Sequence, residues 1–117
     1  MIRQGDIYWI DLDDPHGSAP GFRRPHLVVQ NNVFNASRIN TVLICPLTTN
    51  LARSHSPGNI LLEKGEADLP QTSIVNVSQV ITVNKTDLGE YIGSLSLRRF
   101  REVFNGIKLV LEPRDIE

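Results

Sequence analysis

The spacing of the apolar residues changes once along this chain, and the change limits the folds open to it. Through most of the chain, apolar residues lie in short β-branched runs between turn residues. Near the C-terminus they recur at steps of three and four, which predicts one helix with an apolar stripe. The stripe consists of Leu97, Phe100, Phe104, Ile107 and Leu111. Ser96 is a suitable N-cap, and Pro113 follows the end. Strands followed by a single helix predict a mainly β fold, in which a strongly bent sheet or small barrel carries the C-terminal helix.

Three strands are predicted in the N-terminal half. Residues 5–11 are rich in β-branched and aromatic residues and lead into a long loop of Asp, Pro, Gly and Ser. A second strand follows Pro25, and its continuous apolar run over residues 27–29 predicts a central strand covered on both faces. Residues 41–47 repeat this pattern, and Pro46 near their end indicates an edge position or a bulge.

Shorter elements follow before the helix. Residues 59–62 predict a short strand, and the polar residues 63–72 predict a loop. Residues 74–79 alternate in character, so a regular strand there would place Val75 and Val77 on one face.

Two features of the predicted helix affect its stability and its surface. Gly106 costs about 1 kcal/mol relative to Ala, so the helix depends on docking against the sheet. Arg98, Arg99 and Arg101 in its first part are predicted to form a solvated face rather than a ligand site.

The length of the chain fits one domain, residues 1–117, with one continuous core. No stretch approaches the roughly 20 apolar residues that span a bilayer, and the N-terminus lacks the apolar region of a signal peptide. We therefore expect a cytoplasmic protein without a membrane contact. The single cysteine, Cys45, lies in an apolar run and is expected to pack as a small hydrophobe.

Charge is distributed unevenly along the sequence. The net charge is −1, yet residues 16–62 contain no Asp or Glu while they hold four arginines and all three histidines. A core-rich segment could simply lack charges of both signs. The four arginines favour the other interpretation, a face for an anionic partner, because the local field matters more for binding than the net charge.

Five short motifs occur in an order that identifies a family. They are Gly5-Asp6-Ile7-Tyr8, Gly17-Ser18, Arg24-Pro25-His26-Leu27-Val28-Val29, Pro46-Leu47-Thr48-Thr49 and Gln79-Val80. Together they span nearly the whole chain, which resembles the MazF/PemK toxins of bacterial toxin–antitoxin pairs. The resemblance implies an SH3-like barrel of the PemK/CcdB type and a homodimer. It also implies cleavage of single-stranded RNA without a metal or cofactor, leaving a 2′,3′-cyclic phosphate and a 5′-hydroxyl.

The resemblance assigns the catalytic roles to Arg24 and Thr48. Attack of a ribose 2′-OH on the adjacent phosphate builds negative charge on the phosphoryl oxygens, and a guanidinium offers them two parallel donors. With a pKa above about 12, Arg24 is a poor general base, so its role would be electrostatic stabilisation and leaving-group protonation. Thr48 would donate or relay a hydrogen bond to the scissile phosphate. From the residues alone, a surface ion pair for Arg24 and an ordinary strand end for Thr48 stay open.

Two positions depart from the family pattern. Many relatives carry a glutamate after the Gly-Ser pair, where this chain has Ala19, and a basic residue where it has Ile81. A carboxylate base is therefore missing. Histidine suits proton transfer near neutrality, so His16, just before the Gly-Ser pair, is the candidate substitute; a solvated loop histidine is the alternative. His26, beside an apolar run, could equally be a hydrogen-bonded structural residue.

RNA of this kind is read by stacking unpaired bases and bonding their edges. The candidates are residues within and near the motifs: aromatic, amide, small polar and arginine residues together with Pro25. Each aromatic or amide residue alone is typical of a turn former or a core residue. The predicted RNA-binding residues are Gly17, Ser18, Phe22, Arg23, Pro25, Asn31, Thr49, Asn50, Arg53 and Gln79.

Two other functions remain possible on the same fold. A CcdB-like protein would poison a topoisomerase without chemistry of its own. The presence of Arg24 with Thr48 argues against this function. So does the lack of a C-terminal apolar tail with a tryptophan that might dock such a target, since the only tryptophan is Trp9 in the first strand. A catalytically weak RNA-binding relative is suggested by Ala19 and Ile81. The resemblance also implies a small antitoxin whose acidic tail would occupy the acid-free face and exclude RNA.

Overall fold

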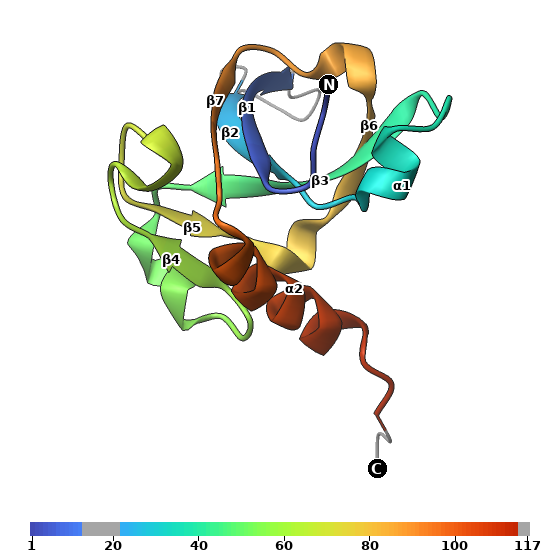
Figure 1. The fold of residues 1–117 in the computed structure, drawn as a ribbon. Coiled ribbons are helices and arrows are strands. Elements are labelled where there is room, and N and C mark those ends of the chain that lie inside the picture. Colours follow the sequence, from blue (N-terminus) through green and yellow to red (C-terminus); the bar gives the residue numbers. More distant parts are fainter. Residues whose placement is uncertain (13–21, 115–117) are drawn as a thin grey trace.

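The apolar runs pair into one antiparallel sheet that curls around a core, with the C-terminal helix against its open side (Figure 1). The computed structural model describes residues 1–12 and 22–114, except for the side chain of Phe22. The strands are β1 (Asp6–Leu12), β2 (Phe22–Val28), β3 (Thr41–Thr48), β4 (Ile60–Leu62), β5 (Ser73–Val75), β6 (Ile81–Asn84) and β7 (Tyr91–Ser94), and the helices are α1 (Asn32–Asn35) and α2 (Leu97–Leu111). Short 3-10 turns cover Leu51–His55, Glu66–Asp68, Val77–Gln79 and Lys85–Asp87. The predicted mainly β fold with a C-terminal helix is confirmed.

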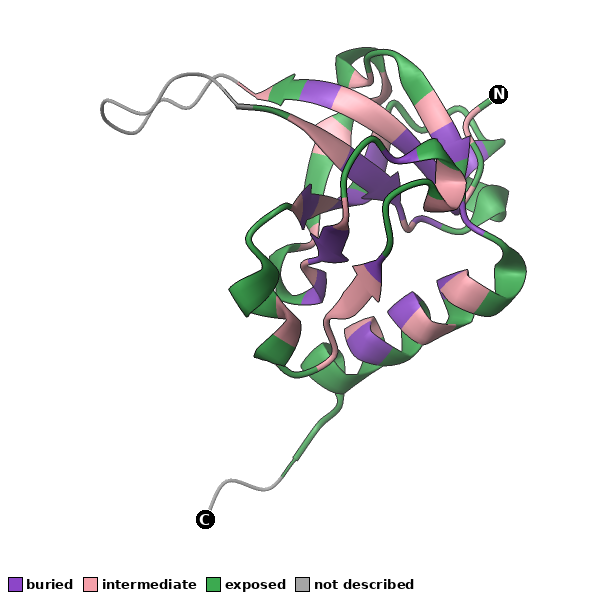
Figure 2. Cartoon of the chain, turned by 90° about the vertical axis from the view of Figure 1, so that its left-hand side faces the viewer, coloured by how far each residue is buried: buried purple, intermediate pink, exposed green. Residues whose placement is uncertain are grey.

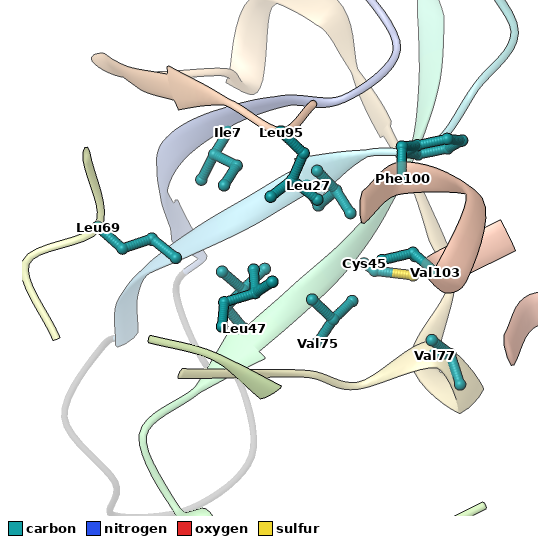
Figure 3. Packing of buried hydrophobic residues seen from close by; sticks show 11 residues of the cluster. Ile7, Leu27, Cys45, Leu47, Leu69, Val75, Val77, Leu95, Phe100 and Val103 are labelled. Carbon is teal, nitrogen blue, oxygen red and sulfur yellow. The ribbon is translucent and has the colours of Figure 1, made fainter. Parts of the chain in front are cut away.

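β2 and β3 form the centre of the sheet, in the order β4-β5-β3-β2-β1-β7, with β6 also paired to β3. Leu27 and Val28 of β2 are both fully buried, but they belong to two different apolar clusters on opposite faces. The prediction of a central strand covered on both faces is therefore confirmed. Cys45 packs beside Leu27 and Val103 in the larger cluster (Figure 3), where burial raises its pKa to about 12. It acts as the predicted small hydrophobe.

Both strand prolines lie where a ladder hydrogen bond is absent. β2 begins at Phe22 rather than after Pro25, which pairs with Trp9 and lies beyond the stretch that pairs with β3. The edge position predicted from Pro46 is wrong, because β3 is central and its neighbour on one side changes from β6 to β5 at this point. The Pro46 carbonyl accepts the Asn76 N–H at 3.0 Å on that side, so its ring nitrogen faces the gap between the two neighbours.

The regular strand considered for residues 74–79 does not form. β5 ends at Val75, its three residues are all buried, and a turn begins at Val77. Asn59 explains the break, since its side-chain oxygen accepts the Val77 N–H at 3.0 Å in place of a strand partner.

Helix α2 forms as predicted, but it buries only part of the predicted stripe, namely Phe100 and, in part, Ile107. Ser96 caps it by accepting the Arg99 N–H at 3.2 Å. The buried positions are Phe100, Val103 and Gly106, whereas Phe104 of the predicted stripe is 49% exposed and Leu111 is 75% exposed. Figure 2 shows the buried and exposed faces of this helix. Within the two described ranges, none of the helices has the length and apolar character that a bilayer crossing requires.

Arg99 does not belong to a solvated face. Only 19% of its side chain is exposed, and it donates to Glu66, to Glu102 and, at 2.6 Å, to the Leu61 carbonyl. The hydrogen bond to Glu66 is the main cause that raises its pKa. Arg99 therefore fastens α2 to the β4–β5 loop, while Arg98 is exposed as predicted.

Candidate functional site

Arg24 and Thr48 come from the two central strands and lie on the same face of the sheet. The β2–β3 pairing ends with His26 opposite Pro46. Arg24 and Thr48 each lie two residues beyond this pair, so strand alternation places both on the same face. Both residues line one cavity of about 300 Å³. The sheet therefore places the predicted catalytic pair at one site.

The cavity combines predicted residues with others that the sequence did not reveal. Its lining consists of Trp9, Arg23, Arg24, Pro25, Leu47, Thr48, Thr49, Pro70, Gln71 and Ser73. Trp9 shares a face with Pro25 through the β1–β2 pairing, which no local pattern could show. Pro70 and Gln71 arrive from the loop between β4 and β5, about 45 residues further along the chain than Arg24.

Among the described residues, the Thr48 hydroxyl has one hydrogen-bond partner. Its oxygen accepts the Asn50 N–H at 3.1 Å, and the Asn50 side chain in turn accepts the Ala52 N–H at the start of the next turn. Because a hydroxyl has one donor and two acceptor positions, the backbone contact leaves the Thr48 proton free to donate into the cavity.

Arg23 stacks on Trp9 at the cavity wall. Its guanidinium carbon lies 4.3 Å from the ring centroid, and it also approaches Glu90 at 3.7 Å. Since both charged side chains are more than half exposed, the ion pair contributes little to stability. Arg23 thus adds a second cation to the lining of the cavity, on a flat aromatic support.

Other predicted residues lie elsewhere. Asn31 caps α1 by accepting the Val33 N–H at 2.8 Å, and it lines a separate groove beside α2. Asn50, Arg53 and Gln79 are exposed and outside the lining of the cavity, so their RNA contacts stay predictions. His16, Gly17, Ser18 and the Phe22 side chain fall outside the described residues. No cluster of three or more His, Cys, Asp or Glu side chains suited to a metal ion occurs in the described ranges.

His26 is a buried structural partner of Arg24. It is 2% exposed, and its Nδ1–H donates to the Arg24 carbonyl at 3.0 Å. Burial lowers its pKa, and the nearby positive charge of Arg24 lowers it further, against the opposing effect of the hydrogen bond. The folded protein therefore favours the neutral form of the His26 ring.

The lowered pKa of His26 predicts acid sensitivity. The unfolded chain binds the proton near pH 6.5, about the ordinary value, while the folded chain binds it only at lower pH. This contribution to the free energy of unfolding is full above about pH 6.5 and is lost as the pH falls through the lowered pKa. Urea unfolding across this range should show less of the loss in His26→Gln, which keeps a donor but does not titrate. The matched variant His55→Gln, at an exposed histidine, should keep the wild-type profile; parallel profiles for wild type and His26→Gln would refute the assignment.

The chain was compared with known families, proteins and structures. Residues 3–111 match the family described as PemK-like, MazF-like toxin of type II toxin-antitoxin system. The chain is 42% identical to Endoribonuclease MazF6 of Mycobacterium tuberculosis, over 96% of this chain and 98% of that protein. It is 32% identical to Endoribonuclease MazF of Staphylococcus saprophyticus, over 95% and 92% of the two chains.

A solved structure shares the architecture. An endoribonuclease from a mycobacterial species, in complex with its cognate antitoxin, superposes with a TM-score of 0.77 at 25% identity, covering 98% of this chain and 100% of that one. The predicted SH3-like barrel of the PemK/CcdB type is thereby confirmed in the form of a curled half-barrel. Family match, sequence identity and fold agree over nearly the whole length, and the chain belongs to the PemK-like, MazF-like toxins of type II toxin–antitoxin systems.

Proposed function

We propose that this protein is a toxin endoribonuclease of the cytoplasm that cleaves single-stranded RNA, mRNA included, and that a cognate antitoxin inhibits it. The names of the relatives support the activity. The observation that supports Arg24 and Thr48 as the catalytic residues is that both line one cavity.

The proposed reaction is a transesterification that needs no metal. The ribose 2′-oxygen bonds to the adjacent phosphorus as its proton leaves, the bond from phosphorus to the 5′-oxygen breaks, and that oxygen takes a proton. The products are a 2′,3′-cyclic phosphate and a 5′-hydroxyl. Arg24 stabilises the charge that develops on the phosphoryl oxygens, and Thr48 donates a hydrogen bond to them. His16 is proposed to assist proton transfer in place of the missing carboxylate; an unchanged pH–rate profile in His16→Ala would exclude it.

Incubation with a long single-stranded RNA in EDTA tests the activity. We expect discrete fragments with 5′-hydroxyl ends at a short recurring sequence. Cleavage abolished by EDTA, or fragments with 5′-phosphates, would contradict the chemistry. Intact RNA with retained binding would favour a catalytically weak relative, and intact RNA without binding would favour the CcdB-like alternative.

We further propose that the protein is a homodimer joined beside α2. The apolar residues that line a groove of about 410 Å³ there include Leu43, Val80, Phe104, Val110 and Leu111, and Val29, Val77, Ile107 and three polar residues complete the lining. Four of the first five are exposed although they are large and apolar, and such a patch is typical of an interface. A second copy would present the same apolar face, as a two-fold contact requires.

Phe104→Asp should yield a monomer. A carboxylate in the centre of an apolar interface would lose its hydration without gaining a partner. In the monomer the same position is half exposed, so the carboxylate would stay hydrated. Light scattering after size exclusion measures the mass, and Arg101→Asp, at an exposed position on the same helix, should keep the dimer. A wild-type monomer, or a dimer that survives Phe104→Asp, would place the interface elsewhere or remove it.

The antitoxin is proposed to carry an acidic tail that occupies the same face as RNA. Arg23 and Arg24 at the cavity would attract a chain of that charge. Binding of antitoxin and RNA should therefore be mutually exclusive, and a stable ternary complex on this face would count against the proposal.

A further inference from the structure

The loop between β4 and β5 is held in an unfavourable backbone conformation. Ala67 and Asp68 are consecutive residues with φ values of 51° and 59°, in the left-handed region that a Cβ disfavours. Such residues persist only where the surrounding structure fixes them, and they concentrate at binding sites. The loop is therefore a candidate for a role beyond connection.

Two contacts fix this loop from opposite sides. Arg99 of α2 donates to Glu66 at 2.8 Å, and both side chains are largely buried. Gly93 of β7 lies so close to the Ala67 carbonyl that no Cβ would fit between them. The loop is thus attached to both the helix and the edge of the sheet.

The end of the loop enters the cavity that holds Arg24 and Thr48. Pro70 and Gln71 both line it. The Gln71 carbonyl accepts the Ser73 hydroxyl at 2.9 Å, and Ser73 is itself buried and lines the same cavity. The backbone of Gln71 is therefore positioned, while the residue is exposed at the cavity.

The dimensions and chemistry of the cavity suit one nucleobase. Its volume of about 300 Å³ is at the lower end of small-ligand sites. Trp9 with Arg23 on its face offers flat surfaces of the kind on which unpaired bases stack. An amide offers one donor and one acceptor side by side, which is the usual means of reading a base edge.

We propose that Gln71 is a specificity-determining residue, whose amide reads the edge of a base held against the stacked Arg23 and Trp9 side chains next to the scissile phosphate. This inference rests on the proposed ribonuclease activity and adds to it the residue that selects the RNA sequence. Arg24 and Thr48 act on the phosphate, which every sequence shares, so discrimination must come from contacts to bases.

Mapping of 5′-hydroxyl ends on a long single-stranded transcript tests the inference. Gln71→Ala should reduce cleavage at the wild-type sequence by roughly tenfold to a hundredfold and relax the preference at one position, because one bidentate contact to a base is lost. Gln71→Glu replaces the amide donor by an acceptor. It should shift the preference at that position toward guanine, whose Watson–Crick edge carries two adjacent donors.

Lys64→Ala is the matched control, since Lys64 is exposed in the same loop but does not line the cavity. It should cleave the wild-type sequence, and all three variants should unfold at the wild-type temperature. Wild-type protein that cleaves RNA together with Gln71 variants that keep its sequence preference would overturn this inference alone. Wild-type protein that cleaves no RNA would overturn the proposed function and this inference with it.

Discussion

Replacing Arg24 with Ala is expected to lower the rate of RNA cleavage by roughly 10²–10³-fold. The variant loses the Arg24 guanidinium, which lines the same cavity as Thr48 and would stabilise the charge on the phosphoryl oxygens. Cleavage of a labelled RNA under single-turnover conditions measures the chemical step, and circular dichroism checks the fold. Arg24→Lys should recover only part of the rate, because an ammonium lacks the two parallel donors.

Arg38→Ala is the control for Arg24→Ala. Arg38 is an exposed arginine of the same acid-free segment, outside the lining of the cavity, so its loss removes equal charge without touching the site. A folded Arg24→Ala variant that retains wild-type activity would show that the catalytic centre lies elsewhere. An equal loss in both variants would indicate that Arg24 contributes general attraction to RNA rather than catalysis.

Gly106→Ala is expected to destabilise the fold by at least about 2 kcal/mol, although Gly-to-Ala changes inside helices ordinarily stabilise by about 1 kcal/mol. A Cβ on Gly106 would collide with the Gly58 carbonyl and lie 3.2 Å from the Val77 side chain. Gly58 has a φ of 79°, so its backbone is tied to a turn that cannot simply move away. Urea unfolding gives the change in free energy.

The neighbouring position supplies the opposite expectation. Asn105 is exposed on the same turn of α2, so Asn105→Ala should be neutral or slightly stabilising through helix propensity alone. Equal effects at the two positions would mean that α2 is not seated on Gly58. Stabilisation by Gly106→Ala would likewise contradict this packing.

The sequence predicts the helix and strands better than the tertiary contacts that these elements make. The helix was found from its period and from Ser96, and the central strand from its continuous apolar run, because these signals are local. Phe104 and Leu111 of the predicted stripe are exposed because the turn at Gly58 selects Gly106 as the contact point, and the helix sequence alone does not indicate this contact. Arg99 was misjudged for the same reason, since Glu66 reaches it from a distant loop.

The candidate site divides in a similar way. Arg24 and Thr48 are predicted from motifs, and in the structure both line one cavity. Trp9 and Gln71 are not predicted in this way, because each becomes part of the cavity only through pairing with another segment or the anchoring of a loop. The residues proposed to discriminate between RNA sequences are those whose position depends on tertiary contacts.

The pairing of β1 with β7 has a consequence for the order of events during synthesis. Asp6 pairs with Ser94, and the Gly5 carbonyl accepts the Leu95 N–H at 2.9 Å. Strand β1 therefore cannot complete its pairing until β7 has been synthesised. The larger core also requires Phe100 and Val103 of α2. A ribosome-bound chain that has not yet released these residues cannot close its half-barrel. The complete half-barrel, with the cavity that Arg24 and Thr48 line, therefore forms only after residues 94–103 have left the ribosome.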